Sequence, residues 1–311
     1  MNIGLFVGAT ATDKIGLTDL VQQGIKAEEE GFDGFWLPNI RGHDALIALS
    51  LIGAETERIS LGSAVVPTYP RHPSALAQQV LSAQTASGGR FILGVGPSHK
   101  PQIEDRLGLS YDKPAKHTRE YITALRGLVS NAKSDFTGEF FNLDYNLEVT
   151  DSSDVPIMIS ALAPAMLRLA GEVSDGTITW MAGVKAIESH VVPRINKAAE
   201  NVGRSKPRVV VGLPLAVSDD KRMAIDTAAS AFERYGTLVN YRRILEAGNV
   251  EGASEVAVIG NEKEVEAQLK AFADAGATDF IASIFPVGTD QEGSKRRSQD
   301  LLRELVGKIN V

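Results

Sequence analysis

Three of the five histidines follow short apolar runs that we interpret as β-strands, at His43, His72 and His99. Histidine titrates near neutral pH, so a histidine at a strand end suits proton transfer. The other two, His117 and His190, lie in or beside helical patterns and are interpreted as solvated or structural. No histidine shows metal-site spacing, and we expect no metal. Further polar and aromatic residues share the strand-end loops: Asn39, Arg41, Thr68, Tyr69, Arg71, Ser98, Lys100 and Trp180.

Several other chemistries have no support in the sequence. The chain has no cysteine, which excludes thiolate nucleophiles and thiolate-bound metals. The segment GVGPSH (residues 94–99) begins like a dinucleotide-binding fingerprint, but His99 stands in place of the third glycine. Neither a G-x-S-x-G elbow nor a phosphate-binding P-loop occurs. We therefore expect neither nucleophilic catalysis nor Rossmann-type nucleotide binding.

The elements that position these residues alternate between short β-branched runs and longer amphipathic runs. This alternation is typical of repeated βα units, and it predicts an α/β fold, a (β/α)8 TIM barrel, as one domain over residues 1–311. The active site of such a barrel lies in the loops after the strands. We predict strands at residues 3–7, 34–37, 59–66, 91–95, 157–160, 176–180, 209–216 and 279–284. We predict helices at residues 17–30, 44–55, 74–86, 116–129, 164–173, 184–201, 221–246 with a break near Gly236, and 262–275.

Two segments depart from the βα rhythm. Residues 136–149 predict a small hairpin inserted before the fifth strand. Residues 248–260 contain the apolar run VAVIG, which could be a short strand or a turn that leads into the last predicted helix.

The third predicted strand carries small residues in its middle, the run GSA at residues 62–64. A buried strand forgoes packing in this way where a ligand or another backbone comes close, although ordinary packing of a barrel strand is the alternative. Three prolines and the pair Arg71–His72 then crowd the following loop. We expect this loop to be rigid and polar.

The segments ERISLGSAVVP (residues 57–67), RHP (71–73) and AQQ (77–79) resemble the luciferase-like flavin and deazaflavin oxidoreductases. They are similar in particular to the branch that uses coenzyme F420, an 8-hydroxy-5-deazaflavin. The resemblance implies a (β/α)8 barrel and F420 as cofactor, with FMN as the alternative. It also implies a non-proline cis peptide against the cofactor ring, here between Ser63 and Ala64.

A second motif covers residues 159–176, where a buried strand ends in small residues and a helix begins at Pro164. Backbone amides at a helix start can hold an anion, although an ordinary βα turn is the alternative. The run AGEVSDG (residues 170–176) resembles the family's A-G-E-x-A-D-G. The resemblance implies that five residues bind the phosphate of the cofactor tail: Ala161, Leu162, Ala163, Pro164 and Ala165.

The end of the second strand departs from the family. Sugar-phosphate and alcohol dehydrogenases of this branch read Asp-His there, whereas this chain reads Asn39–Ile40. Isoleucine cannot accept a proton. We therefore expect the reverse chemistry, hydride transfer from reduced deazaflavin to a C=C or C=N bond of a small organic substrate. His99 stands where related enzymes have a glutamate facing N1 of the ring, so it is the expected proton partner.

The resemblance thus implies a complete site. His99 and Asn39 are the expected catalytic residues, and His43, Tyr69 and Trp180 line the expected substrate pocket. Besides the tail-binding residues, the cofactor contacts are Asn39, Ser63, Ala64, Gly96, Ser98 and His99. Two alternative functions stay open: an FMN-dependent luciferase-like monooxygenase, and a non-catalytic flavin- or deazaflavin-binding protein, which Ile40 favours.

Composition bounds the partners. The formal net charge is −7 and the basic residues are scattered, which argues against nucleic acid. The N-terminus lacks a basic leader, and no apolar run approaches about 18 residues, so we expect neither export nor a membrane span. We expect a cytoplasmic enzyme with a small-molecule substrate, and the resemblance adds a homodimer.

Overall fold

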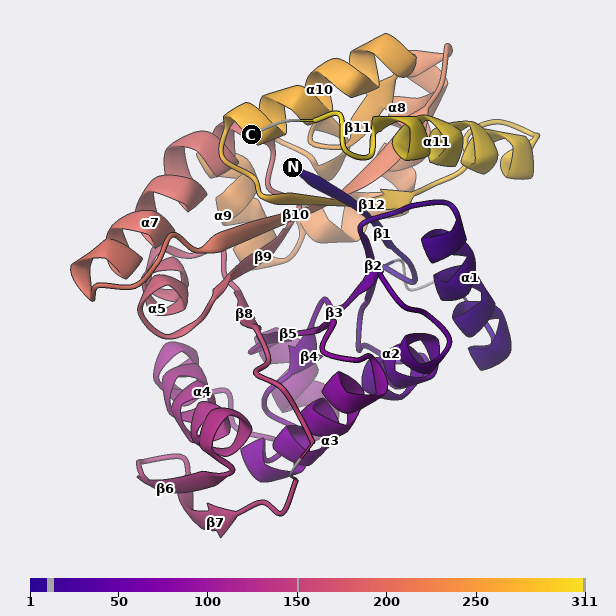
Figure 1. Ribbon diagram of the computed structural model, residues 1–311. Coiled ribbons are helices and arrows are strands. Elements are labelled where there is room, and N and C mark those ends of the chain that lie inside the picture. The colour runs from indigo at the N-terminus through magenta and orange to yellow at the C-terminus, as the bar shows by residue number, and fades with distance from the viewer. Residues whose placement is uncertain (10–13, 150, 310–311) are drawn as a thin grey trace.

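The centre of the computed structural model, which describes residues 1–9, 14–149 and 151–309, is a ring of parallel strands (Figure 1). Every strand of the ring pairs in parallel with both neighbours, and the last pairs with the first, so the sheet closes. In ring order the strands are β1 (Asn2–Phe6), β2 (Gly34–Leu37), β3 (Ser60–Ser63), β5 (Phe91–Gly96), β8 (Ile157–Ser160), β9 (Gly176–Trp180), β10 (Arg208–Val217) and β12 (Asp279–Ile284). The predicted (β/α)8 TIM barrel is confirmed.

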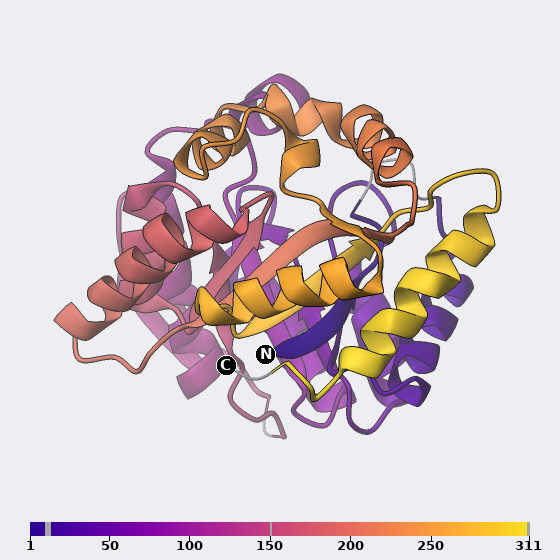
Figure 2. The same cartoon turned by 90° about the horizontal axis from the view of Figure 1, so that it is seen from above.

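The helices lie around the ring on its outside, except the ninth, which lies over the strands (Figures 1 and 2). They are α1 (Leu17–Glu29), α2 (Ala45–Ala54), α3 (Pro73–Ala86), α4 (Pro114–Asn131), α5 (Pro164–Val173), α6 (Val184–Ala186), α7 (Val192–Asn201), α8 (Lys221–Phe232), α9 (Val239–Ala247), α10 (Glu262–Asp274) and α11 (Gln291–Leu305). The sequence prediction missed α11. This helix is strongly polar, and the apolar residues that it buries, Leu301, Leu302 and Leu305, lie in its last turns, so most of its length lacks the apolar residues by which a helix is recognised.

The helix predicted over residues 184–201 is interrupted. Between α6 and α7 lies a π-helical turn, η2 (Ile187–Val191), and Pro193 follows it. Proline has no amide hydrogen to donate to the carbonyl four residues earlier, that of Ser189. The side chain of Arg194 supplies a donor instead, with Nη1 at 3.3 Å from the Ser189 oxygen. A second π-helical turn, η1 (Pro101–Asp105), follows β5.

Three further predictions are settled by short elements. The predicted hairpin is present as the antiparallel pair β6 (Lys133–Thr137) and β7 (Asn142–Asn146). Within residues 248–260, β11 (Val258–Gly260) pairs with the end of β10, so the strand alternative is correct. The predicted break near Gly236 is the 3-10 turn η3 (Glu233–Gly236) between α8 and α9.

The barrel interior is filled by side chains from the ring strands. Phe6, Trp36, Ile92, Met158, Ile178, Val210 and Ile281 form one buried cluster, each from a different strand. The third strand contributes Gly62 at this level. A Cβ at Gly62 would come within 2.1 Å of the Trp36 ring, so the glycine makes room for the indole. The interior is therefore a packed floor beneath the C-terminal end of the barrel.

Candidate functional site

The end of β3 is irregular. The Ser63 hydroxyl accepts from the Gly94 amide at 2.9 Å and donates to the Gly94 carbonyl at 3.0 Å, which ties β3 to β5. The peptide bond after the next residue, Ala64–Val65, is cis, and the chain re-enters the sheet at β4 (Val66–Pro67). The predicted cis bond at Ser63–Ala64 is therefore wrong by one residue. Ser63 still belongs to the β3 ladder, so the departure comes only after it.

Three strand ends meet around Gly96. A Cβ at this glycine would lie 3.0 Å from Val65 Cγ2 and 3.1 Å from Ser160 Cβ. The structure therefore brings together the segments around Ala64, Gly96 and Ser160, which belong to neighbouring strands of the ring. Gly96 lacks a side chain, and Ala64, Val65 and Ser160 carry short ones, so little side-chain volume lies at this point of the mouth of the barrel, the C-terminal end of the ring.

The backbone beyond these strand ends is unusual. Ser98, after β5, has φ of 61°, and Met181, after β9, has φ of 60°. Residues other than glycine rarely adopt this left-handed region, and they concentrate at functional sites. The π-helical turns η1 and η2 follow the same two strands. The strand between them in the ring is β8, which ends at the predicted tail-binding segment.

The segment after β8 leaves backbone donors free. Ala163 caps α5 without a side-chain hydrogen bond, whereas Asp44 and Asn261 cap α2 and α10 with theirs. Among the described residues, the amides of Leu162 and Ala163 have no acceptor. Ala161 is buried, while Pro164 and Ala165 are exposed. Free amides at a helix start suit an anionic ligand.

Aromatic rings close the mouth. The Trp180 ring lies edge-on to Phe6 at 5.4 Å and to Tyr235 at 5.7 Å, and Tyr235 lies at 5.0 Å from Tyr241. His99 completes this chain of rings at 5.4 Å from Tyr241. Figure 2 shows the orange segment of η3 and α9, which carries both tyrosines, arching over the strands. The sequence reasoning missed Tyr235 and Tyr241, although the aromatic residues around the Gly236 break were a usable signal.

The pKa shifts of the histidine and tyrosine side chains at the mouth favour their uncharged forms. Burial, followed by the nearby Arg234 guanidinium, lowers the pKa of His99 below its ordinary value. Burial raises the pKa of Tyr241 and of Tyr235. The Trp180 indole N–H lies close to the Tyr235 hydroxyl but does not meet hydrogen-bond geometry with it. At neutral pH the site thus holds an uncharged imidazole that has one donor and one acceptor nitrogen.

Two predicted residues have structural partners. The Asn39 Oδ1 accepts from the Ala45 amide at 2.9 Å, which helps Asp44 to cap α2. Tyr69 is stacked between Tyr111, at 5.1 Å, and His117, at 3.9 Å. Tyr69 therefore belongs to an aromatic stack beside the mouth. Burial raises the pKa of Tyr111 to about 12 and lowers that of His117 to about 4.

The two other strand-end histidines lie apart from the aromatic rings at the mouth. His43 is exposed in the loop before α2. His72 caps α3, with Nδ1 at 3.3 Å from the Ser74 amide. His99 is thus the strand-end histidine that the structure joins to the mouth rings.

Comparison with known proteins identifies the family. A family model described as luciferase-like monooxygenase matches residues 1–297. The chain belongs to this family. A relative is the 5,10-methylenetetrahydromethanopterin reductase of Methanolobus tindarius, which is 29% identical over 278 residues, 89% of this chain and 84% of that protein.

Two solved structures share the fold of this luciferase-like chain. An F420-dependent secondary alcohol dehydrogenase in complex with an F420-acetone adduct has a TM-score of 0.82 at 20% identity, over 100% of this chain and 99% of that one. The oxygenating constituent of 3,6-diketocamphane monooxygenase of Pseudomonas putida, in complex with FMN, has a TM-score of 0.78 at 15% identity, over 100% of this chain and 99% of that one.

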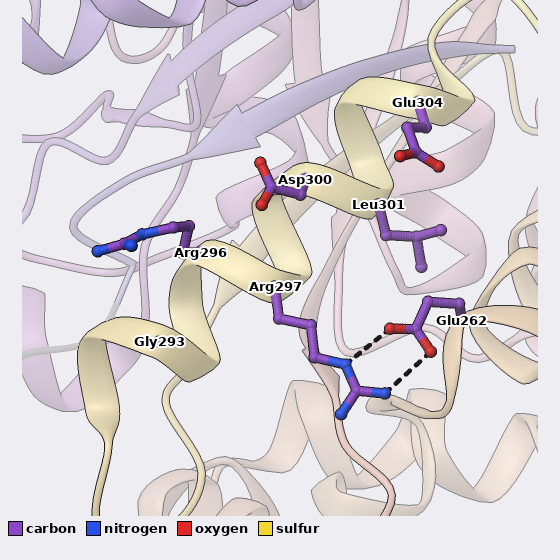
Figure 3. Close-up of a pocket in the computed structure, with 7 residues that line it drawn as sticks. All are labelled: Glu262, Gly293, Arg296, Arg297, Asp300, Leu301 and Glu304. Carbon is purple, nitrogen blue, oxygen red and sulfur yellow. Dashed lines mark hydrogen bonds and ion pairs between the residues drawn. The ribbon is translucent and has the colours of Figure 1, made fainter.

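A separate pocket of about 370 Å³ lies on the outside of the luciferase-like barrel (Figure 3). There Arg297 of α11 binds both oxygens of Glu262, with Nε and Nη2 at 2.6 and 2.9 Å, and pairs with Asp219. The wall of this pocket carries charges of both signs, from Glu262, Arg296, Arg297, Asp300 and Glu304. Within the described ranges no helix is long and apolar enough to span a membrane, and no cluster of His, Asp or Glu suits a metal ion.

Proposed function

We propose that this luciferase-like chain is an F420-dependent oxidoreductase that transfers hydride from reduced deazaflavin to a C=C or C=N bond of a small organic substrate. The observation that carries the proposal is the meeting of Ala64–Val65, Gly96 and Ser160 beside the free amides of Leu162 and Ala163. The relatives named above support it, since one is a reductase and one is described as F420-dependent.

The residues present fit such a cofactor. The small side chains at the three strand ends leave backbone for a flat ring to contact, and the free amides match the phosphate of an anionic tail. When bound, a reduced deazaflavin supplies hydride. Ala64, Gly96 and Ser98 would hold the ring, and residues 161–165 the tail.

His99 is the proposed proton partner. Its pKa lies below the ordinary value, so at neutral pH one imidazole nitrogen can donate a proton and the other can accept one. Phe6, Trp180, Tyr235 and Tyr241 would exclude water from this proton and keep it at the imidazole.

The proposed direction is reduction, because the end of β2 offers no base. Ile40 follows Asn39 and is 58% exposed, and the Asn39 oxygen already caps α2. Oxidation of an alcohol needs a group that accepts the hydroxyl proton, whereas reduction of a C=C or C=N bond needs only a proton donor.

The test is a pair of titrations of the purified protein, with F420 and with FMN, followed by their absorbance and fluorescence. We expect tight binding of F420 and weaker binding of FMN. Reduced F420 should then be reoxidised by members of a panel of activated alkenes and cyclic imines. Tight FMN binding with no F420 binding would contradict the proposal.

An FMN-dependent monooxygenase is the second candidate, since a solved structure of this fold contains FMN. It predicts that reduced FMN with the protein consumes oxygen when substrate is added. A non-catalytic binding protein is the third candidate, and Ile40 is the residue that favours it. It predicts cofactor binding with no turnover in either assay.

We also propose a homodimer through the outer face of α2 and α3, which lie side by side (Figure 1). Neither helix contains a charged residue, although 23% of the chain is charged. Ile47 and Leu51 are 58% and 44% exposed, one turn apart on α2. Interface cores are depleted in charge, so a second copy can pack here without opposing like charges.

A further inference from the structure

His190 contacts the segment to which we assign the cofactor tail. It lies on η2, between β9 and α7, and its Nε2 is 2.8 Å from the carbonyl oxygen of Leu162. A carbonyl oxygen only accepts, so Nε2 carries the hydrogen and donates it. The ring is half-buried and belongs to a different βα unit from Leu162.

This hydrogen bond determines the direction of an amide. In a trans peptide the carbonyl and the following N–H point in opposite directions across one rigid plane. When His190 holds the Leu162 oxygen, the Ala163 N–H is directed away from η2. The Ala163 amide has no acceptor in the described part of the chain, so its hydrogen is available to a ligand.

The turn that carries His190 is itself supported. The Arg194 Nη1 donates to the carbonyl of His190 at 3.0 Å and to that of Ser189 at 3.3 Å. Pro193 has no amide hydrogen to donate to the Ser189 carbonyl, so the Arg194 side chain supplies a donor there. Such single π-helical turns are frequent at functional sites. The hydrogen bonds from Arg194 help to hold the His190 imidazole in one position against the end of β8.

We propose that His190 is a positioning residue for the anionic cofactor tail, which it serves by fixing the Leu162–Ala163 peptide with its amide ready to donate to the phosphate. This rests on the proposed function, since it needs the tail to lie after β8. A donor that is fixed before binding loses little freedom when the ligand arrives, which strengthens binding.

The experiment compares ligands with and without the phosphate-bearing tail, and the pair FMN and riboflavin differs in the phosphate alone. F420 is compared with its 8-hydroxy-5-deazariboflavin core, and FMN with riboflavin, by titration of the parent and of H190A, H190N and H190Q. We expect H190A and H190N to bind the phosphate-bearing ligands about three- to tenfold more weakly, the typical weight of one hydrogen bond. Binding of the two phosphate-free ligands should not change. The Gln amide reaches about as far as Nε2, so H190Q should recover part of the loss.

The matched control is S189A, on the same turn, whose exposed hydroxyl donates to the Lys185 carbonyl and makes no other hydrogen bond within the described residues. It should bind all four ligands as the parent does. Equal weakening of phosphate-bearing and phosphate-free ligands in H190A would mean a general structural role and would overturn the proposal. Circular dichroism of each variant identifies any that fails to fold, and H190N and H190Q then decide the question.

Failure of the tail site is distinguishable from failure of the His190 proposal. If the parent binds F420 and its phosphate-free core equally well, the tail does not lie on the amides after β8, and both proposals fall. If the parent prefers the phosphate-bearing ligands and H190A keeps that preference, the tail site stands and the role of His190 is refuted.

Discussion

Substitution of Gly62 by alanine tests the packed floor beneath the site. The new Cβ would lie 2.1 Å from Trp36 Cε3 and 2.3 Å from Cζ3, while carbon atoms pack at about 3.5–4.0 Å. Trp36 is 2% exposed and surrounded by the other interior residues, so its ring must shift by roughly 1.5 Å in a filled space. Overpacking of this kind costs about 1–3 kcal/mol or more, and reduced freedom of the unfolded chain offsets about 0.4–1 kcal/mol.

We therefore expect G62A to lower the free energy of unfolding by about 2 kcal/mol in urea denaturation. Phenylalanine at Trp36 removes Cε3 and Cζ3, the two ring atoms that the new Cβ would approach most closely, so the double variant G62A/W36F should be more stable than the sum of the single changes predicts, by about 1 kcal/mol or more. The control G42A, with no atom within 4 Å of its Cβ, should stay within about 0.5 kcal/mol of the parent. A G62A protein as stable as the parent would refute the packing argument.

Four further predictions follow. R90A should lose about 3 kcal/mol of stability, because the guanidinium donates to three backbone carbonyls at 2.6–2.9 Å around the end of α2; a loss under about 0.5 kcal/mol would be inconsistent with this. H99A should keep most of the cofactor affinity but transfer hydride at least about 100-fold more slowly. Because the pKa of His99 is lowered, the rate of the parent should be constant above pH 6.5 and change only below it. Equal rates of parent and variant from pH 5 to 9 would exclude His99 as the proton partner. The pKa of His117 is about 4 in the folded protein and about 6.5 in the unfolded chain, because burial disfavours the charged imidazole. Its contribution to the free energy of unfolding is therefore complete above pH 6.5, and about 3 kcal/mol of that free energy is lost as the pH falls towards 4. Urea denaturation of H117Q at several pH values should lack this loss. L51K should convert the proposed dimer to a monomer in light scattering with unchanged cofactor affinity, whereas V202K, at an exposed position after α7, should leave the oligomeric state as it is.

The order of βα units was accessible from the sequence because hydrophobic periodicity is a local property. Strands buried on both faces read as apolar runs, and the helices that cover them read as amphipathic runs. The strands at residues 34–37, 157–160, 176–180 and 279–284 were predicted with the observed boundaries. The helix α11 was missed because residues 291–300 contain no apolar side chain, so its apolar residues begin only at Leu301.

The candidate site was only partly accessible from the sequence. The small residues of β3, the start of α5 at Pro164 and the position of His99 are local features, and all were recognised. The cis bond, which the family resemblance implied, was misplaced by one residue; Ser63 stays in the β3 ladder and is bonded to Gly94 of another strand, contacts that the local sequence does not show. The stacking of Tyr69 between Tyr111 and His117 was not accessible from the sequence, because it depends on the loop after β5 and on α4, while the place of Tyr69 in a substrate pocket stays a prediction.

By itself, the sequence determined the barrel, the order of its strands and the small residues at the ends of β3 and β8. Only the tertiary structure decided which side chains meet at the mouth. Phe6 and Tyr235 are separated by most of the chain, yet both contact Trp180 because the sheet closes and η3 arches over it. The bond from His190 to Leu162 likewise joins two separate βα units. Periodicity shows which face of one element is apolar, whereas such contacts exist only once the ring of strands has closed.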